Sequence, residues 1–365
     1  MSRPREAAFV IPHPYVDSLA CFREPIRAMA RAGWRIDLFT PPSSSHPPPV
    51  FEEEGVRVRA LEVSPAGTAR LMTALATHRP RYRWIVTVPQ WALHYAGIAA
   101  SLARIPMVCI SDEMSAEAEA LTAAQRRWKR RERLAHQRCA FTIALSEGRA
   151  RCIREENRLP AGHAIFVVPN SAPGPAVRLA SHFYQDTLDI APDKFVLLHA
   201  GSWWWRLQFG DIEERAQHFG PDVVLAFQGR LRDGINGTRA HANIRFGSTL
   251  LPSTLLDYAV SSAHAGLALY DLETANHREV GTASGKIALY MKNALPVITT
   301  AQPSLAWIEQ EGCGVCVEHV GQIGDAVRRI RTDYDRCVAN VKRCYDEYFD
   351  FDRAFAPVLA RFERA

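Results

Sequence analysis

The chain has 365 residues, of which 47% are hydrophobic and 23% are charged, and its formal net charge is +5. This balance is typical of a folded globular protein with about two domains, and it excludes a mostly disordered chain, a collagen and a disulfide-stapled miniprotein. The mild positive charge permits anionic partners but does not indicate nucleic acid.

The first half of the chain alternates apolar strands with helices. We expect strands at 8–12, 35–40, 56–61, 84–88, 106–111 and 140–145. Helical spacing of apolar residues predicts helices over 18–32, 90–103 and 115–138, and Gly33 is expected to end the first of them. Continuous apolar strands that alternate with helices indicate a parallel sheet covered on both faces.

The same pattern restarts in the second half. A strand is expected at 164–168, followed by a linker with a short helix over 171–194. Further strands are predicted at 195–200, 222–227, 243–246, 265–270 and 296–299, and a helix at 322–331. We therefore predict an α/β protein with two Rossmann-like doubly wound domains facing a cleft, over residues 1–170 and 171–340. A helix over 341–365 is expected to follow, with the option of crossing back to the first domain.

The segment 276–300 carries the strongest chemical signal. The small-residue loop Gly281-Thr-Ala-Ser-Gly285 precedes an amphipathic helix that begins near Lys286. Free N–H groups at a helix start bind phosphate, a lysine adds a full positive charge, and Ser284 and Thr282 add hydroxyl donors. This combination fits a diphosphate site, although a loop that merely caps the helix would look the same.

Several motifs fall in the order found in one known family. The stretch Ser284-Gly-Lys-Ile-Ala-Leu-Tyr-Met-Lys-Asn-Ala-Leu-Pro-Val-Ile298 resembles the pattern SGK-L-x-E-Y-M-x-x-G-x-PVI. Val168-Pro-Asn170, Leu198-His-Ala-Gly-Ser202, Phe227-Gln-Gly-Arg230 and Gly312-Cys-Gly314 resemble further motifs of the same family. Over nearly its whole length the chain is similar to GT-B-fold glycosyltransferases of the retaining family-4 type.

The resemblance implies a function in polysaccharide biosynthesis. The enzyme would move a sugar from a nucleotide-diphosphate sugar, UDP- or GDP-linked, to a hydroxyl of a saccharide, a lipid-linked acceptor or a small molecule. It would need no cofactor beyond this co-substrate and no metal, and it would retain the anomeric configuration. A non-catalytic glycosyltransferase-like binding protein is the alternative, and a nucleotide-sugar epimerase is a weaker one.

The resemblance also assigns candidate donor-site residues. Lys286 and Arg206 are expected to stabilise the leaving diphosphate. The family places a glutamate where this chain has Leu289, so Glu279 or Asn276 are candidate substitutes for contacting the ribose. The expected donor-binding set is Gly201, Ser202, Asn276, Glu279, Thr282, Ser284, Gly285 and Lys286. For Arg206 the alternative is a surface arginine beside aromatic packing.

Candidate acceptor-side residues lie in the first half of the chain. Asp112 follows an expected strand and corresponds to the family's acidic or histidine position near the transferred sugar, so we list it as catalytic. Acceptor contacts are expected from His13, Asp17, His94 and Glu113. Glu113 could instead cap the following helix, and a lone histidine such as His94 more often packs among its neighbours.

Two remaining features concern partners and location. The run Arg126-Arg-Trp-Lys-Arg-Arg-Glu-Arg133 fits either a solvated helix face or contact with an anionic membrane, and nucleic acid is not expected. Cys313-Gly-Val-Cys316 has the spacing of a metal-ligand pair, but without a second pair a structural role is expected. No membrane-spanning run and no signal peptide are recognised, so we expect a cytoplasmic protein, with the inner face of the membrane as an option.

Overall fold

The structure is a computed structural model that describes residues 5–43, 48–120, 122–201, 212, 215–216, 218–229, 243–249 and 251–364. The chain forms two compact units. Unit 1 contains Met1–Pro173, Thr274–Glu279 and Phe351–Ala365, and unit 2 contains Gly174–Glu273 and Val280–Asp350. The chain therefore enters unit 1 three times, once through a segment of six residues.

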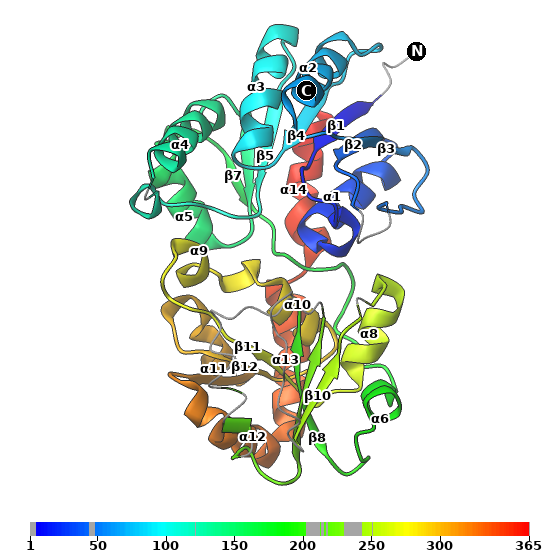
Figure 1. Ribbon diagram of the computed structural model, residues 1–365, viewed down its shortest axis with the longest axis vertical. Helices are drawn as coiled ribbons and strands as arrows, with labels where there is room; N and C mark the ends of the chain where they lie inside the picture. The colour runs from blue at the N-terminus through cyan, green and yellow to red at the C-terminus, as the bar shows by residue number, and fades with distance from the viewer. Residues whose placement is uncertain are drawn as a thin grey trace. The chain divides into compact units, whose positions relative to one another are not determined.

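Unit 1 is built on a seven-stranded sheet in which every neighbouring pair is parallel (Figure 1). The strand order is β3-β2-β1-β4-β5-β6-β7. The strands are β1 (Glu6–Val10), β2 (Arg35–Thr40), β3 (Val56–Ala60), β4 (Trp84–Thr87), β5 (Met107–Ser111), β6 (Phe141–Ala144) and β7 (Ile165–Val167). The order of the strands reverses between β1 and β4, and ligands of doubly wound folds bind outside the carboxyl ends of strands at such a point.

Several helices of unit 1 begin at recognisable polar caps. They are α1 (Ala20–Arg31), α2 (Pro65–Thr77), α3 (Trp91–Ala103), α4 (Ala123–His136), α5 (Glu147–Glu156), α9 (Ala275–Arg278) and α14 (Phe351–Glu363), with short 3-10 turns η1 (Val16–Ser18) and η2 (Glu117–Glu119). The hydroxyls of Ser64, Thr122 and Ser146 cap α2, α4 and α5. Capping satisfies N–H groups that would otherwise lack a partner, so these residues fix where each helix starts.

Unit 2 repeats the architecture with a six-stranded parallel sheet in the order β10-β9-β8-β11-β12-β13. Its strands are β8 (Phe195–Ala200), β9 (Val223–Gln228), β10 (Ile244–Gly247), β11 (Ala265–Ala268), β12 (Val297–Thr300) and β13 (Gly314–Val317). Its elements also include α6 (Phe183–Leu188), α8 (Ser253–Ser261), η4 (Gly281–Ala283), α10 (Gly285–Lys292), η5 (Pro303–Leu305), α11 (Trp307–Gln310), η6 (Val320–Gln322), α12 (Ile323–Thr332) and α13 (Tyr334–Tyr348). The strand order here reverses between β8 and β11.

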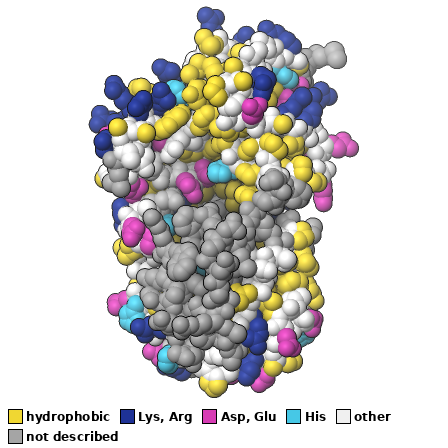
Figure 2. Space-filling model, viewed as in Figure 1, with side chains coloured by type: hydrophobic (Ala, Val, Ile, Leu, Met, Phe, Trp, Pro, Cys, Tyr) yellow, Lys and Arg dark blue, Asp and Glu magenta, His cyan; other side chains and the backbone are white. Residues whose placement is uncertain are grey.

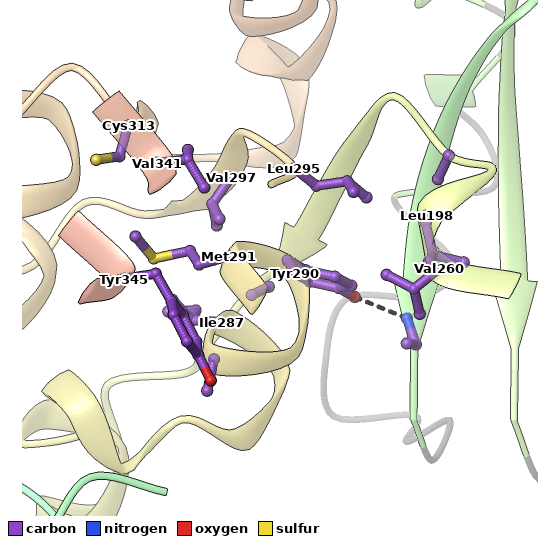
Figure 3. Packing of buried hydrophobic residues seen from close by; sticks show 14 of the residues in the cluster. Leu198, Val260, Ile287, Tyr290, Met291, Leu295, Val297, Cys313, Val341 and Tyr345 are labelled. Atoms are coloured by element: carbon purple, nitrogen blue, oxygen red, sulfur yellow. Dashed lines mark hydrogen bonds between the residues drawn. The ribbon is translucent and has the colours of Figure 1, made fainter. Parts of the chain in front are cut away.

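The core of unit 2 is organised around Tyr290 of α10 (Figure 3). Its ring is fully buried, and a Cβ on Gly266 of β11 would lie 2.2 Å from the ring carbons. The phenol oxygen accepts a hydrogen bond from the N–H of Ala200 (2.7 Å) and donates to the carbonyl of Leu267 (3.2 Å). One side chain thus fixes α10 against the ends of the two central strands.

The structure confirms the predicted fold of two parallel-sheet Rossmann-like domains, and it corrects several elements. The helix expected over 115–138 is split, since η2 ends at Glu119 and Thr122 caps α4. Helix α2 was not predicted. The C-terminal helix expected over 341–365 is interrupted, because α13 ends at Tyr348 and α14 begins at Phe351. No helix in the described part of the chain is long and apolar enough to span a membrane.

Candidate functional site

The loop after β8 opens the candidate donor site of unit 2. Gly201 follows β8 directly, has a φ of +118° and donates its N–H to the carbonyl of Gln228 (2.9 Å). Gly229 lies against it so closely that a Cβ there would be 2.2 Å from the Gly201 oxygen. Two glycines therefore let the β8 and β9 loops approach each other, and Gly201 leaves exposed backbone at the point where the strand order reverses.

The start of α10 supplies the second wall of this site. Ser284 caps the helix by accepting a hydrogen bond from the N–H of Ile287 (3.0 Å), and its hydroxyl also hydrogen-bonds the phenol of Tyr270. Ser284 is buried, and both of these hydrogen bonds are made to groups of the protein. The backbone N–H groups of Gly285 and Lys286 have no acceptor among the described residues. These two donors, at the positive end of the helix dipole, are suited to an anion.

Lys286 lies beside Gly201 and Tyr270. Its side-chain carbons would lie 3.7 Å and 3.9 Å from a Cβ on Gly201, and its Nζ is 5.8 Å from the centroid of the Tyr270 ring. No carboxylate pairs with this ammonium in the part of the chain that the structure describes. Burial lowers the pKa of Lys286 to about 8. An ammonium that lacks a counter-ion and is partly desolvated is prepared to accept a bound anion.

The structure describes only some of the other residues predicted to bind the donor. Thr282 lies on η4 and is half-buried. Ser202 and Arg206 lie outside the described residues. Leu289, where the resembling family has glutamate, packs against the apolar core of unit 2. Tyr270 was not predicted as a site residue. Its place at the end of β11 was the available signal, and Thr300 holds its backbone through two hydrogen bonds (2.8 Å and 3.1 Å).

Asn276 and Glu279 lie in the six-residue segment that belongs to unit 1. The Asn276 side-chain oxygen accepts a hydrogen bond from the N–H of Met114 (3.2 Å), and Arg149 donates to the Asn276 carbonyl (3.0 Å). Ser146 donates to the carbonyl of Glu279 (2.8 Å). The Asn276 amide oxygen is thus engaged by the loop that follows β5.

Asp112 lies at the carboxyl end of β5. Its side chain is only 14% exposed, and its Oδ2 lies 3.7 Å from Nε2 of His13, which follows β1. Burial, reinforced by the neighbouring charge of Glu113, raises the pKa of Asp112 from 3.8 to about 7. Burial lowers the pKa of His13. Near neutral pH Asp112 can therefore gain or lose a proton, as a group that handles a hydroxyl proton must.

Replacing Asp112 with asparagine is expected to stabilise the protein in a pH-dependent way. Because the folded-state pKa lies above the unfolded value, ionising Asp112 opposes folding, and stability falls as the pH rises from about 4 to 7. D112N should therefore gain about 2 kcal/mol of unfolding free energy at pH 8 and almost nothing at pH 4. Urea unfolding at both values tests this, with D193N, a change at an exposed carboxylate, as the control. An equal gain at both values would contradict the assigned cause.

The remaining predicted acceptor residues are spread over unit 1. Asp17 lies on η1, and Glu113 is exposed beside Asp112. His94 packs through its ring against Tyr95 and Trp128, at centroid distances of 4.9 Å and 6.0 Å, and in the described part of the chain no hydrogen bond, ion pair or ring contact joins it to His13 or Asp112. His94 therefore has the surroundings of a histidine that packs among its neighbours, which was the alternative to an acceptor contact.

Sequence reasoning missed two residues of unit 1. Arg149 of α5 is buried and donates to the carbonyls of both Asp112 (2.5 Å) and Asn276 (3.0 Å), so it joins the β5 loop to the segment Thr274–Glu279. Gln90 follows β4 at the point where the strand order reverses, and its backbone has a φ of 64° and a ψ of −111°. Such strained backbone on a non-glycine residue is concentrated at functional sites. Neither feature has a sequence signature, since one is a long-range contact and the other a backbone angle.

The cysteine pair of the sequence analysis lies in unit 2. Cys313 is buried, Cys316 is half-buried, and both are free thiols. Both pack in or against the apolar core cluster around Tyr290. Among the described residues no group of three His, Cys, Asp or Glu side chains is arranged to hold a metal ion.

Comparisons with known proteins bear on the family and on the fold. Residues 20–171 match the family model of the glycosyl transferase 4-like domain. Among solved structures, sucrose-phosphate synthase from Thermosynechococcus elongatus is similar with 17% identity and a TM-score of 0.73, covering 99% of each chain. The chain has the GT-B glycosyltransferase fold. The predicted resemblance to glycosyltransferases of the family-4 type is thereby confirmed.

Two further GT-B structures extend the comparison. HepE from Anabaena, solved in complex with UDP and glucose, has 13% identity and a TM-score of 0.74, covering 99% of this chain and 100% of HepE. A protein described as a UDP-N-acetylglucosamine 2-epimerase from Listeria monocytogenes has 10% identity and a TM-score of 0.63, covering 99% and 98%. At these identities the similarity establishes the fold alone. No curated protein matches the sequence.

Proposed function

We propose that the protein is a glycosyltransferase that moves a sugar from a nucleoside-diphosphate sugar to an acceptor hydroxyl, without a metal and with retention. The observation that carries this proposal is the Lys286 ammonium, which has no counter-ion among the described residues, at a helix start where the N–H groups of Gly285 and Lys286 have no acceptor there either. The donor is UDP- or GDP-linked, and the acceptor is a saccharide, a lipid-linked sugar or a small molecule.

The donor's diphosphate would bind unit 2 at the start of α10. The N–H groups of Gly285 and Lys286 would donate to phosphate oxygens, and the exposed Gly201 backbone allows a ligand to approach closely. As the glycosidic bond breaks, negative charge grows on the diphosphate. A positive group fixed beside those oxygens stabilises the transition state more than the ground state, which is what lowers the barrier. Arg206 is proposed as the second cation of this site.

Asp112 of unit 1 would contact the transferred sugar or the acceptor. Its pKa near 7 lets the carboxylate accept a hydrogen bond from a hydroxyl and take up its proton. His13, whose pKa is lowered by burial, would be neutral and could orient the same hydroxyl. Retention needs no enzymic base in the proposed reaction, so the loss of Asp112 is expected to reduce the rate without abolishing it.

Two alternatives predict different products. A glycosyltransferase-like binding protein would bind the nucleotide without turnover, and an epimerase would isomerise the sugar while the nucleotide stays attached. The chain should be incubated with UDP-glucose and with GDP-mannose, each with simple glycoside acceptors, and the products separated by liquid chromatography and mass spectrometry. Release of UDP or GDP together with a new glycoside supports the proposal. A new epimer without nucleotide release, or binding without any product, contradicts it.

Nucleotide affinity should depend on pH through Lys286. The ammonium is charged below its pKa of about 8 and neutral above it, so UDP should bind equally well from pH 7 to 7.5 and more weakly above pH 8. The loss is expected to approach roughly 10-fold by pH 9, because each pKa unit corresponds to a factor of ten. Calorimetric titration of UDP measures it. K286R should abolish the decline, since a guanidinium stays charged, and a decline that persists in K286R would assign it to another group.

A further inference from the structure

Helices α3 and α4 form one continuous outer face of unit 1. The rings of His94 and Tyr95 on α3 contact the Trp128 ring of α4, at centroid distances of 6.0 Å and 6.3 Å. Further along both helices, a Cβ on Gly97 would lie 3.8 Å from the Cβ of Ala135. The two helices therefore pack against each other, and we call their solvent-exposed side the α3–α4 face.

This face carries an excess of positive charge. Helix α3 contains no Asp or Glu, and the single acid of α4, Glu132, is buried against Lys129 (3.2 Å). Four exposed arginines have no carboxylate partner in the described part of the chain: Arg104, Arg127, Arg130 and Arg138. Figure 2 shows dark blue side chains gathered at the edge of the molecule where Figure 1 places α4.

Apolar side chains stand among these arginines. Leu102 of α3 is 75% exposed and Leu134 of α4 is 52% exposed. Leu134 is four residues from Arg130, so the two belong to the same stripe of the α4 surface, and Arg138 follows the end of the helix at His136. Closely spaced like charges on one helix lower its stability. Exposed arginines and leucines together are suited to a partner whose surface is anionic and whose layer below that surface is apolar.

We propose that the α3–α4 face docks onto an anionic lipid bilayer. The guanidinium groups would meet the phosphate headgroups, and Leu102 and Leu134 would enter the boundary with the acyl chains. A nucleic acid fits this face less well. Its bases would need a free aromatic ring to stack on, and the Trp128 ring is already covered by Arg131 (4.9 Å) and contacted by His94 and Tyr95. The proposal goes beyond the proposed function and needs neither donor nor acceptor.

Vesicle co-sedimentation of the full chain tests the proposal. Binding is measured to vesicles of phosphatidylcholine alone and to vesicles with about 30% phosphatidylglycerol, at about 50 mM and about 500 mM salt. The wild type should bind only the anionic vesicles, and high salt should release it. R127E/R130E/R138E should weaken binding by roughly 100-fold or more, given the contribution of each arginine near a charged surface. L102S/L134S should weaken binding at low salt, but less than the arginine variant does.

A charge-matched control separates this face from the net charge of the chain. R328E/R329E/R336E changes the charge equally at exposed arginines of unit 2, and it should retain most of the binding. Equal losses in the two triple variants would overturn the proposal, as would a wild type that ignores anionic vesicles at low salt. Tight binding of a DNA duplex without vesicle binding would assign the face to nucleic acid instead. Melting temperatures of all variants establish that they are folded.

Discussion

Replacing Lys286 with alanine is expected to reduce kcat/KM for a nucleoside-diphosphate sugar by roughly 100- to 1,000-fold, the usual cost of removing one group that stabilises developing negative charge. Lys286 is the described cation nearest to Gly201 and the start of α10. Its loss should lower kcat more than it raises KM, because charge on the diphosphate grows as the bond breaks. Steady-state kinetics with the donor identified by product analysis measure both values.

The matched control for this substitution is K342A. Lys342 lies in the same unit on α13 and is exposed, so its removal is the same chemical change without the proposed role. K342A should keep kcat/KM within about twofold of the wild type. If K286A retained full kcat while K342A was also unaffected, the diphosphate would have to bind elsewhere.

Replacing Gly266 with alanine is expected to give the largest loss of stability, about 3–5 kcal/mol, because the new methyl group has no space. A Cβ there would lie 2.2 Å from ring carbons of Tyr290, which is fully buried and hydrogen-bonded to Ala200 and Leu267. The ring must move for the methyl group to fit, and both hydrogen bonds then break. Urea unfolding followed by circular dichroism gives the change in free energy.

Two further observations separate this steric cause from a general effect of alanine. G162A serves as the control, since Gly162 is exposed and a Cβ there meets nothing within 4 Å. It should change the free energy of unfolding by less than about 0.5 kcal/mol. G266A should also weaken UDP binding, because Tyr290 holds Ala200 directly before Gly201. A stable G266A variant with normal UDP affinity would show that Tyr290 does not organise the donor loop.

The strands could be predicted because their physical signal is local. The run Phe195–Ala200 is buried along its whole length and apolar except at His199, and a strand buried on both faces needs little else. Helix α2 was missed because few of its residues are buried, although Ser64 and Pro65 offered a start signal. The helix at 115–138 was extended too far because polar residues before Thr122 share its composition, and only the capping hydrogen bonds separate them.

The candidate donor site was predictable only in part. The small residues of Gly281–Gly285 and the lysine that follows them indicate an anion site in the sequence. Two other features depend on contacts between elements, which the sequence does not show. They are the hydrogen bond between the Tyr270 phenol and Ser284, and the packing of the Tyr290 ring against Gly266. The segment Thr274–Glu279 belongs to unit 1 through hydrogen bonds that join residues 127 to 162 positions apart. Pairings at such separation follow from the topology and not from local sequence.

The most direct test of the central claim is thermal melting of the purified protein with UDP, GDP, ADP, CMP and dTDP, each at millimolar concentration, repeated on K286A. A ligand that binds only the folded protein must raise its melting temperature by mass action. We expect one of the nucleotides, UDP or GDP, to stabilise the wild type by several degrees and to leave K286A unchanged. No shift with any nucleotide, or an equal shift in K286A, would contradict a nucleoside-diphosphate site at Lys286.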